Sequence, residues 1–226
     1  MRAYMRHCLA LFLVLAAHAA EPLSVNRAPR DFSIADPSKR WKAPDVRASV
    51  NPMGEPSPAA FTYQVLWTPD YLYFRFECPY TELVLRPQLD TKNETYQLWD
   101  WDVAEVFIGA DYNNIKRYRE YQVSPRGEWV DLDIDRSRSV PGPTAAAWNS
   151  GFTVSGKIDE KKKVWYAAMK IPMKSIDEAP IAAGKKFRFN VYRLSGTGRD
   201  RSTMWVPVGN PSHHTPEKFG EMILAK

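Results

Sequence analysis

The chain has 226 residues, a formal net charge of +5 at pH 7 and eight tryptophans. That length suits one β domain with a sizeable core. The sequence contains no dense tract of lysine and arginine, which argues against a nucleic-acid partner. The three lysines at 161–163 are typical of a charged hairpin tip.

Residues 1–20 have the pattern of a secretory signal peptide. Arg2 and Arg6 form a cationic start, residues 9–17 form an apolar run, and Ala-His-Ala at 17–19 is a small-x-small cleavage signal. The apolar run is shorter than the roughly 20 residues that span a bilayer, and an uncleaved anchor is the alternative. Cys8 precedes the run, which argues against a lipid anchor. We expect an exported protein, free of the membrane after cleavage, with a net charge of about +3 because Arg2 and Arg6 are lost.

Cys78 is the only cysteine beyond the predicted signal peptide, so the mature chain forms no intramolecular disulfide. Export without disulfides is typical of a bacterial secreted or periplasmic protein rather than a small extracellular eukaryotic domain. We expect this protein to be a monomer.

Residues 21–60 differ in composition from the rest of the mature chain. They are rich in proline and polar residues, with Trp41 as the main apolar residue and no sustained hydrophobic period. This segment is predicted to be an irregular N-terminal arm that wraps the domain formed by residues 61–226.

From Phe61 onward, short runs with period-two alternation recur about every ten residues, without a long helical pattern. Turn residues separate them, such as Thr-Pro-Asp at 68–70 and Ser-Pro-Arg-Gly at 124–127. A short helical turn is expected at 173–176. The pattern predicts an all-β, single-domain, jelly-roll-like antiparallel β-sandwich, with strands at 64–67, 71–77, 103–108, 118–123, 128–134, 152–158, 164–171, 187–192 and 221–224.

The segment at 99–108 reads Trp-Asp-Trp-Asp-Val-Ala-Glu-Val-Phe-Ile. An exposed indole can cover the C–H face of a sugar ring while neighbouring acids accept hydrogen bonds from its hydroxyls. We expect one of Trp99 and Trp101 to face inward and Trp99 to be the exposed one. Strand alternation places Glu105 and Phe107 on one face. Glu105 then either pairs with an arginine or points into a polar cavity, because an unpaired buried carboxylate is costly.

Several segments, in this order, resemble the family 9 carbohydrate-binding modules, in particular the exported proteins described as family 9-like. Individually they are weak signals, and together they cover the chain from Trp67 to Leu224. They are Tyr-Leu-Tyr-Phe-Arg-Phe at 71–76, Trp99 with Asp102 and Val-Ala-Glu-Val-Phe at 103–107, Glu-Tyr-Gln-Val-Ser-Pro-Arg-Gly-Glu-Trp at 120–129, Trp-Tyr at 165–166 before Ile-Pro at 171–172, Trp-Val-Pro at 205–207 and Pro-Glu-Lys-Phe-Gly at 216–220.

The resemblance implies a β-sandwich that binds carbohydrate without catalysis. Its two ring-clamping tryptophans match Trp99 and Trp205, its strand glutamate matches Glu105, and its polar pocket positions match Gln122 and Asn190. The implied ligand is a plant-type polysaccharide, an oligosaccharide or its chain end, and the implied role is in carbohydrate catabolism.

The chain departs from the family pattern in two places. The usual Asp-Ser-Val-Glu reads Asp-Val-Ala-Glu at 102–105, and residues 193–201 stand where an Asp-containing segment is expected. The second departure leaves the identity of the sugar open.

Two further groups could take part in chemistry. His213 and His214 could bond to a sugar, although a solvated loop pair is the favoured interpretation. Asp131, Asp133 and Asp135 alternate along one strand, where oxygen ligands could hold calcium; an exposed polar face is favoured, and we expect no cofactor.

Three other functions are consistent with parts of the sequence. A glycoside hydrolase would use Glu105 with Asp100, Asp102 or Glu120 as a carboxylate pair. A haem-binding sandwich would need a methionine with His213 or His214, since Cys-x-x-Cys-His is absent. A protein-interaction module would use surface aromatics such as Trp205.

Overall fold

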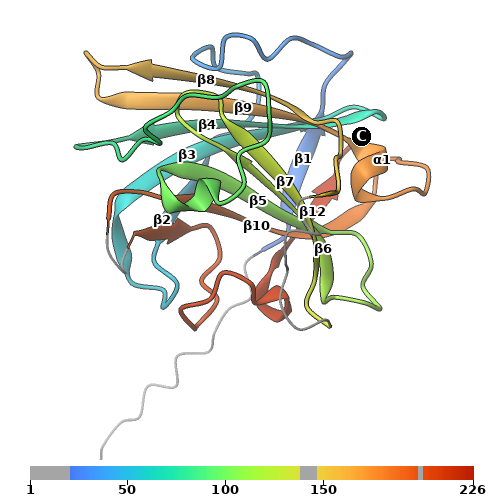
Figure 1. Cartoon of the computed structure of the whole chain (residues 1–226). Helices are drawn as coiled ribbons and strands as arrows, with labels where there is room; N and C mark the ends of the chain where they lie inside the picture. The colour runs from blue at the N-terminus through green and yellow to red at the C-terminus, as the bar shows by residue number, and fades with distance from the viewer. Residues whose placement is uncertain (1–20, 138–146, 198–200) are drawn as a thin grey trace, which may run out of the picture.

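The computed structural model describes residues 21–137, 147–197 and 201–226, and the predicted signal peptide lies outside the described residues. This part of the chain is built mainly of strands (Figure 1), with one short helix, α1 (Met173–Ile176), and 3₁₀ turns at Leu98–Asp100 and Pro216–Lys218. The strands are β1 (Leu23–Arg27), β2 (Val46–Val50), β3 (Pro56–Trp67), β4 (Tyr71–Pro79), β5 (Val103–Gly109), β6 (Arg117–Val123), β7 (Trp129–Asp135), β8 (Thr153–Asp159), β9 (Val164–Pro172), β10 (Lys186–Leu194), β11 (Ser202–Met204) and β12 (Gly220–Leu224).

The strands pack as two layers of a continuous, folded-over sheet. One layer has the order β7-β6-β5-β10, with β11 and β12 pairing different parts of β10; the other has the order β2-β3-β4-β9-β8. The pairing of Met204 with Val50 joins β11 to β2, and β1 runs parallel to both β12 and β3. All other pairings are antiparallel, which confirms the predicted β-sandwich.

Each strand that the sequence predicted is present, as is the helical turn at 173–176. The hairpin at 68–70 closes with a 2.8 Å hydrogen bond from the Thr68 amide to the Tyr71 carbonyl. The second hairpin turn, at 124–127, places Gly127 at a φ of 85°, a conformation that glycine adopts without steric cost. The three lysines at 161–163 join β8 to β9, as expected.

The N-terminal segment is more regular than the sequence predicted, because it contains β1 and β2. Between these strands it covers the outer face of the β3-β4-β9 layer. Phe32 stacks on Tyr73 with ring centroids 4.3 Å apart, and Trp41 meets Phe32 edge-on. The buried Arg75 of β4 donates to the carbonyl of Pro37 at 2.7 Å. This bond gives the backbone oxygen of Pro37 a hydrogen-bond partner. The segment therefore supplies part of the packing of that layer.

The main core lies between the two layers. On β5, Ala104, Val106 and Ile108 point into it, and Glu105 and Phe107 point to the opposite face, as the alternation predicted. A second apolar cluster, which includes Phe107, covers that outer face. Loops border this outer face of the β7-β6-β5-β10 layer, and the pocket described next lies there.

Candidate functional site

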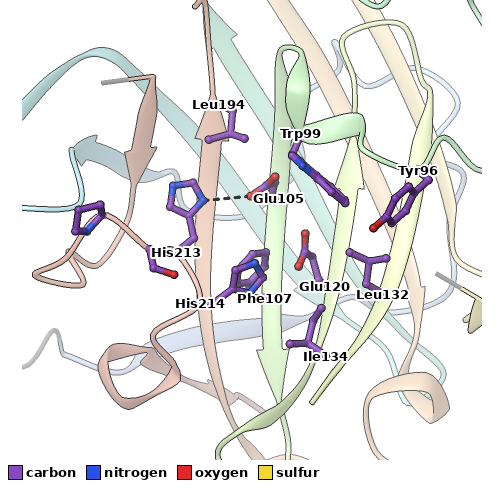
Figure 2. Close-up of a pocket in the computed structure, with 12 residues that line it drawn as sticks. Tyr96, Trp99, Glu105, Phe107, Glu120, Leu132, Ile134, Leu194, His213 and His214 are labelled. Atoms are coloured by element: carbon purple, nitrogen blue, oxygen red, sulfur yellow. Dashed lines mark ion pairs between the residues drawn. The ribbon is translucent and has the colours of Figure 1, made fainter. Parts of the chain in front are cut away.

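One pocket of about 330 Å³ lies on the outer face of β5, β6, β7 and β10. Its base is formed by strand residues, and two loops border it (Figure 2): Tyr96 and Trp99 lie on one side and His213 on the other. The lining residues are Tyr96, Trp99, Glu105, Phe107, Glu120, Leu132, Ile134, Leu194, Pro211, Ser212, His213 and His214.

Glu105 points into this pocket from the middle of β5 (Figure 2). Only 2% of the residue is exposed, and none of its ion pairs among the described residues is with an arginine. Its ion-pair neighbour is His213, whose Nδ1 lies 3.8 Å from Glu105 Oε2. Of the two environments expected for Glu105, the structure therefore shows the polar cavity and not the arginine pair.

Glu120 is a second buried carboxyl group in the same pocket. It pairs in register with Phe107 on the neighbouring strand, so its side chain lies beside that of Glu105. Gln122 Nε2 donates to Glu120 Oε1, whereas Oε2 is buried and has no hydrogen-bond partner in the described part of the chain. Burial, together with the charge of Glu105, raises the pKa of Glu120 well above its usual value. The base of the pocket therefore has hydrogen-bonding capacity that the protein leaves unused.

Trp99 and Tyr96 form an aromatic pair at the mouth of the pocket. Their rings meet edge-on with centroids 5.3 Å apart, and Tyr96 is 42% exposed. The following turn is held in place by Asp102, whose Oδ1 accepts a 2.8 Å hydrogen bond from the amide of Gly196. Trp99 and Trp101 are both partly buried, so the expected division into one inward and one exposed indole is wrong, but only Trp99 lines the pocket.

His213 lies across the pocket from Trp99. Its ring stacks on Tyr192 with centroids 5.0 Å apart and an interplanar angle of 15°, and its Nε2 lies 2.5 Å from Ser202 Oγ. Its side chain is 15% exposed. The expectation of a solvated histidine pair is therefore wrong, because sheet residues hold this ring against Glu105.

His214 also packs against residues of the sheet. It stacks on Phe107 at 5.1 Å, and its Nδ1 lies 2.6 Å from the Tyr118 hydroxyl. Burial lowers the pKa of His214 to about 4, so this ring is neutral at pH 7. His214 therefore lines the pocket with a neutral aromatic ring.

Gln122 and Asn190, both predicted to contact the ligand, are completely buried and do not line the pocket. Gln122 pairs in register with Glu105, and its Nε2 donates to Glu120 Oε1. Asn190 fixes the backbone of Val206, with its Nδ2 donating to the carbonyl at 2.7 Å and its Oδ1 accepting from the amide at 3.1 Å. In this structure both residues position their neighbours.

Trp205 also lies away from the pocket. Its indole packs on Phe189 with ring centroids 4.6 Å apart, and a Cβ atom added at Gly220 would lie 2.6 Å from its Cζ3. Phe189 points into the core between the layers. The structure therefore brings Trp99 and Glu105 together, but it does not place Trp205 opposite Trp99.

The aspartates of β7 were expected to form an exposed polar face. The structure does not show such a face. Asp131 is buried, with its Oδ2 accepting a 2.7 Å hydrogen bond from the Ser150 amide, and Asp133 pairs with Arg117 and Arg119. Across the residues that the structure describes, no three His, Cys, Asp or Glu side chains are arranged to ligate a metal ion.

The sequence analysis did not predict Tyr96 or Glu120 as ligand contacts, and it favoured a solvated loop pair over sugar contacts for His213 and His214. A sequence signal existed for Glu120, because it lies two residues before Gln122 in a strand and therefore shares its face. Asp100 and Asp102, named with Glu120 as possible partners of Glu105, do not line the pocket. The other three residues lie in loops, whose paths no local pattern defines.

Comparisons with known proteins place this fold among carbohydrate-binding modules. A family 9 module from Caldicellulosiruptor kristjanssonii in complex with glucose matches with 12% identity and a TM-score of 0.62, covering 91% of this chain and 97% of that one. The same organism's family 9 structure in complex with cellotriose gives 13% identity and a TM-score of 0.56, covering 91% of this chain and 94% of that one. A candidate carbohydrate-binding protein from Bacteroides uniformis gives 15% identity and a TM-score of 0.62, over 80% of this chain and 86% of that one.

At these identities the structural likeness shows the fold. A search of curated proteins finds no match. No helix in the described ranges is long and apolar enough to span a membrane. The family described as "Carbohydrate family 9 binding domain-like" matches residues 38–226, most of the sequence. The chain belongs to this carbohydrate family 9 binding domain-like family.

Proposed function

We propose that this protein binds a carbohydrate in the pocket beside Trp99 without catalysing its hydrolysis. One observation carries the proposal: Trp99 and Glu105 line the same pocket, an aromatic ring beside a buried acceptor. A sugar ring needs both, since its C–H faces pack on an aromatic plane and its hydroxyls donate to carboxylates.

The pocket has the dimensions and the chemistry for one sugar unit. Its volume of about 330 Å³ lies at the lower end of the range for ligand pockets. Trp99 and Tyr96 offer apolar surface at the mouth, and Glu105 and Glu120 accept hydrogen bonds at the base. Such open sites typically bind with micromolar to millimolar dissociation constants, about 4–8 kcal/mol.

The ligands to test first are glucose and cello-oligosaccharides, because these occupy the family 9 module from Caldicellulosiruptor kristjanssonii. We further propose that the protein is exported by the signal peptide at residues 1–20 and acts as a monomer in the capture of polysaccharide fragments. Size-exclusion chromatography of the mature protein tests the monomer, and N-terminal sequencing of the exported form tests the cleavage.

Isothermal titration with these sugars tests the proposal. Trp99→Ala should weaken binding at least about tenfold, equivalent to about 1.4 kcal/mol. Trp101→Ala is the matched control, since this indole lies two residues away and outside the pocket. Unchanged affinity in Trp99→Ala would refute the assignment of the site.

The hydrolase alternative has its own test. Purified protein should release no reducing sugar from cellodextrin or xylan. Release that is abolished in Glu105→Gln would make the protein an enzyme. The structure adds no support for the haem alternative, because His213 Nε2 and His214 Nδ1 are already hydrogen-bonded to Ser202 and Tyr118.

A further inference from the structure

The base of the pocket is acidic and has no fixed positive charge. Glu105 and Glu120 are each at most 3% exposed, and no lysine or arginine of the described chain lines the pocket. Burying a charge is costly unless a partner of opposite sign compensates it. The raised pKa of Glu120 reflects this cost, because burial and the charge of Glu105 disfavour its ionised form.

Glu120 marks where compensation is missing. Its Oε1 accepts from Gln122, and its Oε2 is buried without a partner, although the side chain points into the pocket (Figure 2). An unsatisfied buried acceptor costs about 1–3 kcal/mol, and more when it is charged. A ligand group that donates to Oε2 and carries positive charge would satisfy this oxygen and favour the ionised form of Glu120.

The groups around Glu120 do not supply that charge. His214 is neutral at pH 7, and Arg136, whose charge acts on His214 and Tyr118, does not line the pocket. His213 Nδ1 lies 3.8 Å from Glu105 Oε2, and no ion pair of the described residues joins it to Glu120. The ionisable side chains of this cluster are Glu105, Tyr118, Tyr192, His213 and His214, with Arg136 and Glu217 acting on it from outside the pocket lining.

We propose that the pocket prefers sugars bearing a protonated primary amine, such as glucosamine units, over the corresponding neutral sugars. The ammonium group would lie between Glu105 and Glu120 and donate to the free Oε2, with the sugar ring against Trp99. The aromatic rings of Trp99, Tyr96 and Phe107 favour a cation through their π faces. This inference rests on the proposed function and narrows its ligand class.

The test compares dissociation constants for glucosamine, glucose and N-acetylglucosamine by isothermal titration at a pH at which the amine is protonated. These sugars share one ring and differ at one substituent. We expect glucosamine to bind at least about tenfold more tightly than glucose or N-acetylglucosamine. Glu120→Gln should bring the ratio of glucosamine to glucose affinity close to one, whereas Glu160→Gln, an exposed acid in the β8–β9 turn, should preserve it.

The outcomes separate the two proposals. Glucose binding as tightly as glucosamine would overturn the amine preference and leave carbohydrate binding intact. A preference that persists in Glu120→Gln would overturn the role of this carboxylate. Ethanolamine, an amine without a ring, binding as tightly as glucosamine would overturn recognition of an amino sugar. Failure of every sugar to bind would overturn both proposals.

Discussion

Trp205 and Phe189 pack together, 4.6 Å between ring centroids, against the core between the layers and on the opposite side of the sheet from the pocket that Trp99 lines. The two tryptophans that the family resemblance pairs therefore lie apart in this chain. The aromatic partner of Trp99 is Tyr96, and the residue facing it is His213. Substitution of Trp99 and substitution of Trp205 should therefore have different effects on binding and on stability.

Replacing Trp205 should affect stability more than binding. Trp205→Ala removes a ring packed on Phe189 and Gly220, and we expect it to lower the free energy of unfolding by about 2–4 kcal/mol. Urea unfolding measures this change, and titration with sugar below the transition measures affinity. A stable Trp205→Ala protein that has lost binding would instead support a contact between Trp205 and the ligand.

Gly156 of β8 should tolerate no side chain. A Cβ atom there would lie 2.4 Å from the amide nitrogen of Gly127 and 2.8 Å from the carbonyl oxygen of Pro125, and backbone atoms cannot move aside easily. Gly156→Ala should destabilise the protein by about 2–3 kcal/mol in urea unfolding.

Gly184→Ala is the comparison for Gly156→Ala, because no atom lies within 4 Å of its Cβ position and only its φ of +87° opposes a side chain. It should cost about 1 kcal/mol. Equal losses in the two variants would show that the contact between β8 and the 124–127 turn is not tight.

Phe32 should hold the N-terminal segment against the sheet without affecting the pocket. Phe32→Ala removes the stack on Tyr73 on the other layer, and we expect a loss of about 2 kcal/mol and faster limited proteolysis between β1 and β2. Sugar affinity should stay unchanged. Met53→Ala, at a side chain that is 59% exposed, should change none of the three measurements.

His214 should make stability depend on pH in the acidic range. Burial depresses its folded-state pKa from 6.5 to about 4, so between these values the unfolded chain binds a proton that the folded chain does not. The contribution of His214 is complete above pH 6.5 and falls by about 2–3 kcal/mol as the pH drops toward 4.

The comparison for this effect is His214→Gln, whose amide keeps a polar partner for Tyr118. The difference between the unfolding free energies of the two proteins, measured from pH 4 to 7.5, isolates His214 from the acidic groups that titrate in the same range. A difference that does not vary with pH would contradict a buried neutral histidine.

The sequence was sufficient for most of the sandwich. Alternation is a local property, so it located β5 and correctly assigned Glu105 and Phe107 to one face. The strands β1 and β2 escaped prediction because they lie in a proline-rich segment without a sustained hydrophobic period, and β11 because it has only three residues. Too few residues alternate in them, and their pairing is with strands distant in the chain.

The sequence predicted less of the candidate site than of the fold. Glu105 and Trp99 belong to a strand and the turn before it, so their proximity follows from a short segment. The position of Trp205 depends on how the chain turns after β11, and the entry of His213 into the pocket depends on its stacking on Tyr192. These are tertiary contacts, which periodicity and spacing do not encode.

A crystal structure of the mature protein with its tightest-binding sugar tests the central claim most directly. The account predicts a sugar ring against Trp99, with hydrogen bonds to Glu105 and Glu120 and with His213 on the far side. A ring bound at Trp205, or elsewhere on the surface with the pocket beside Trp99 unoccupied, would contradict it.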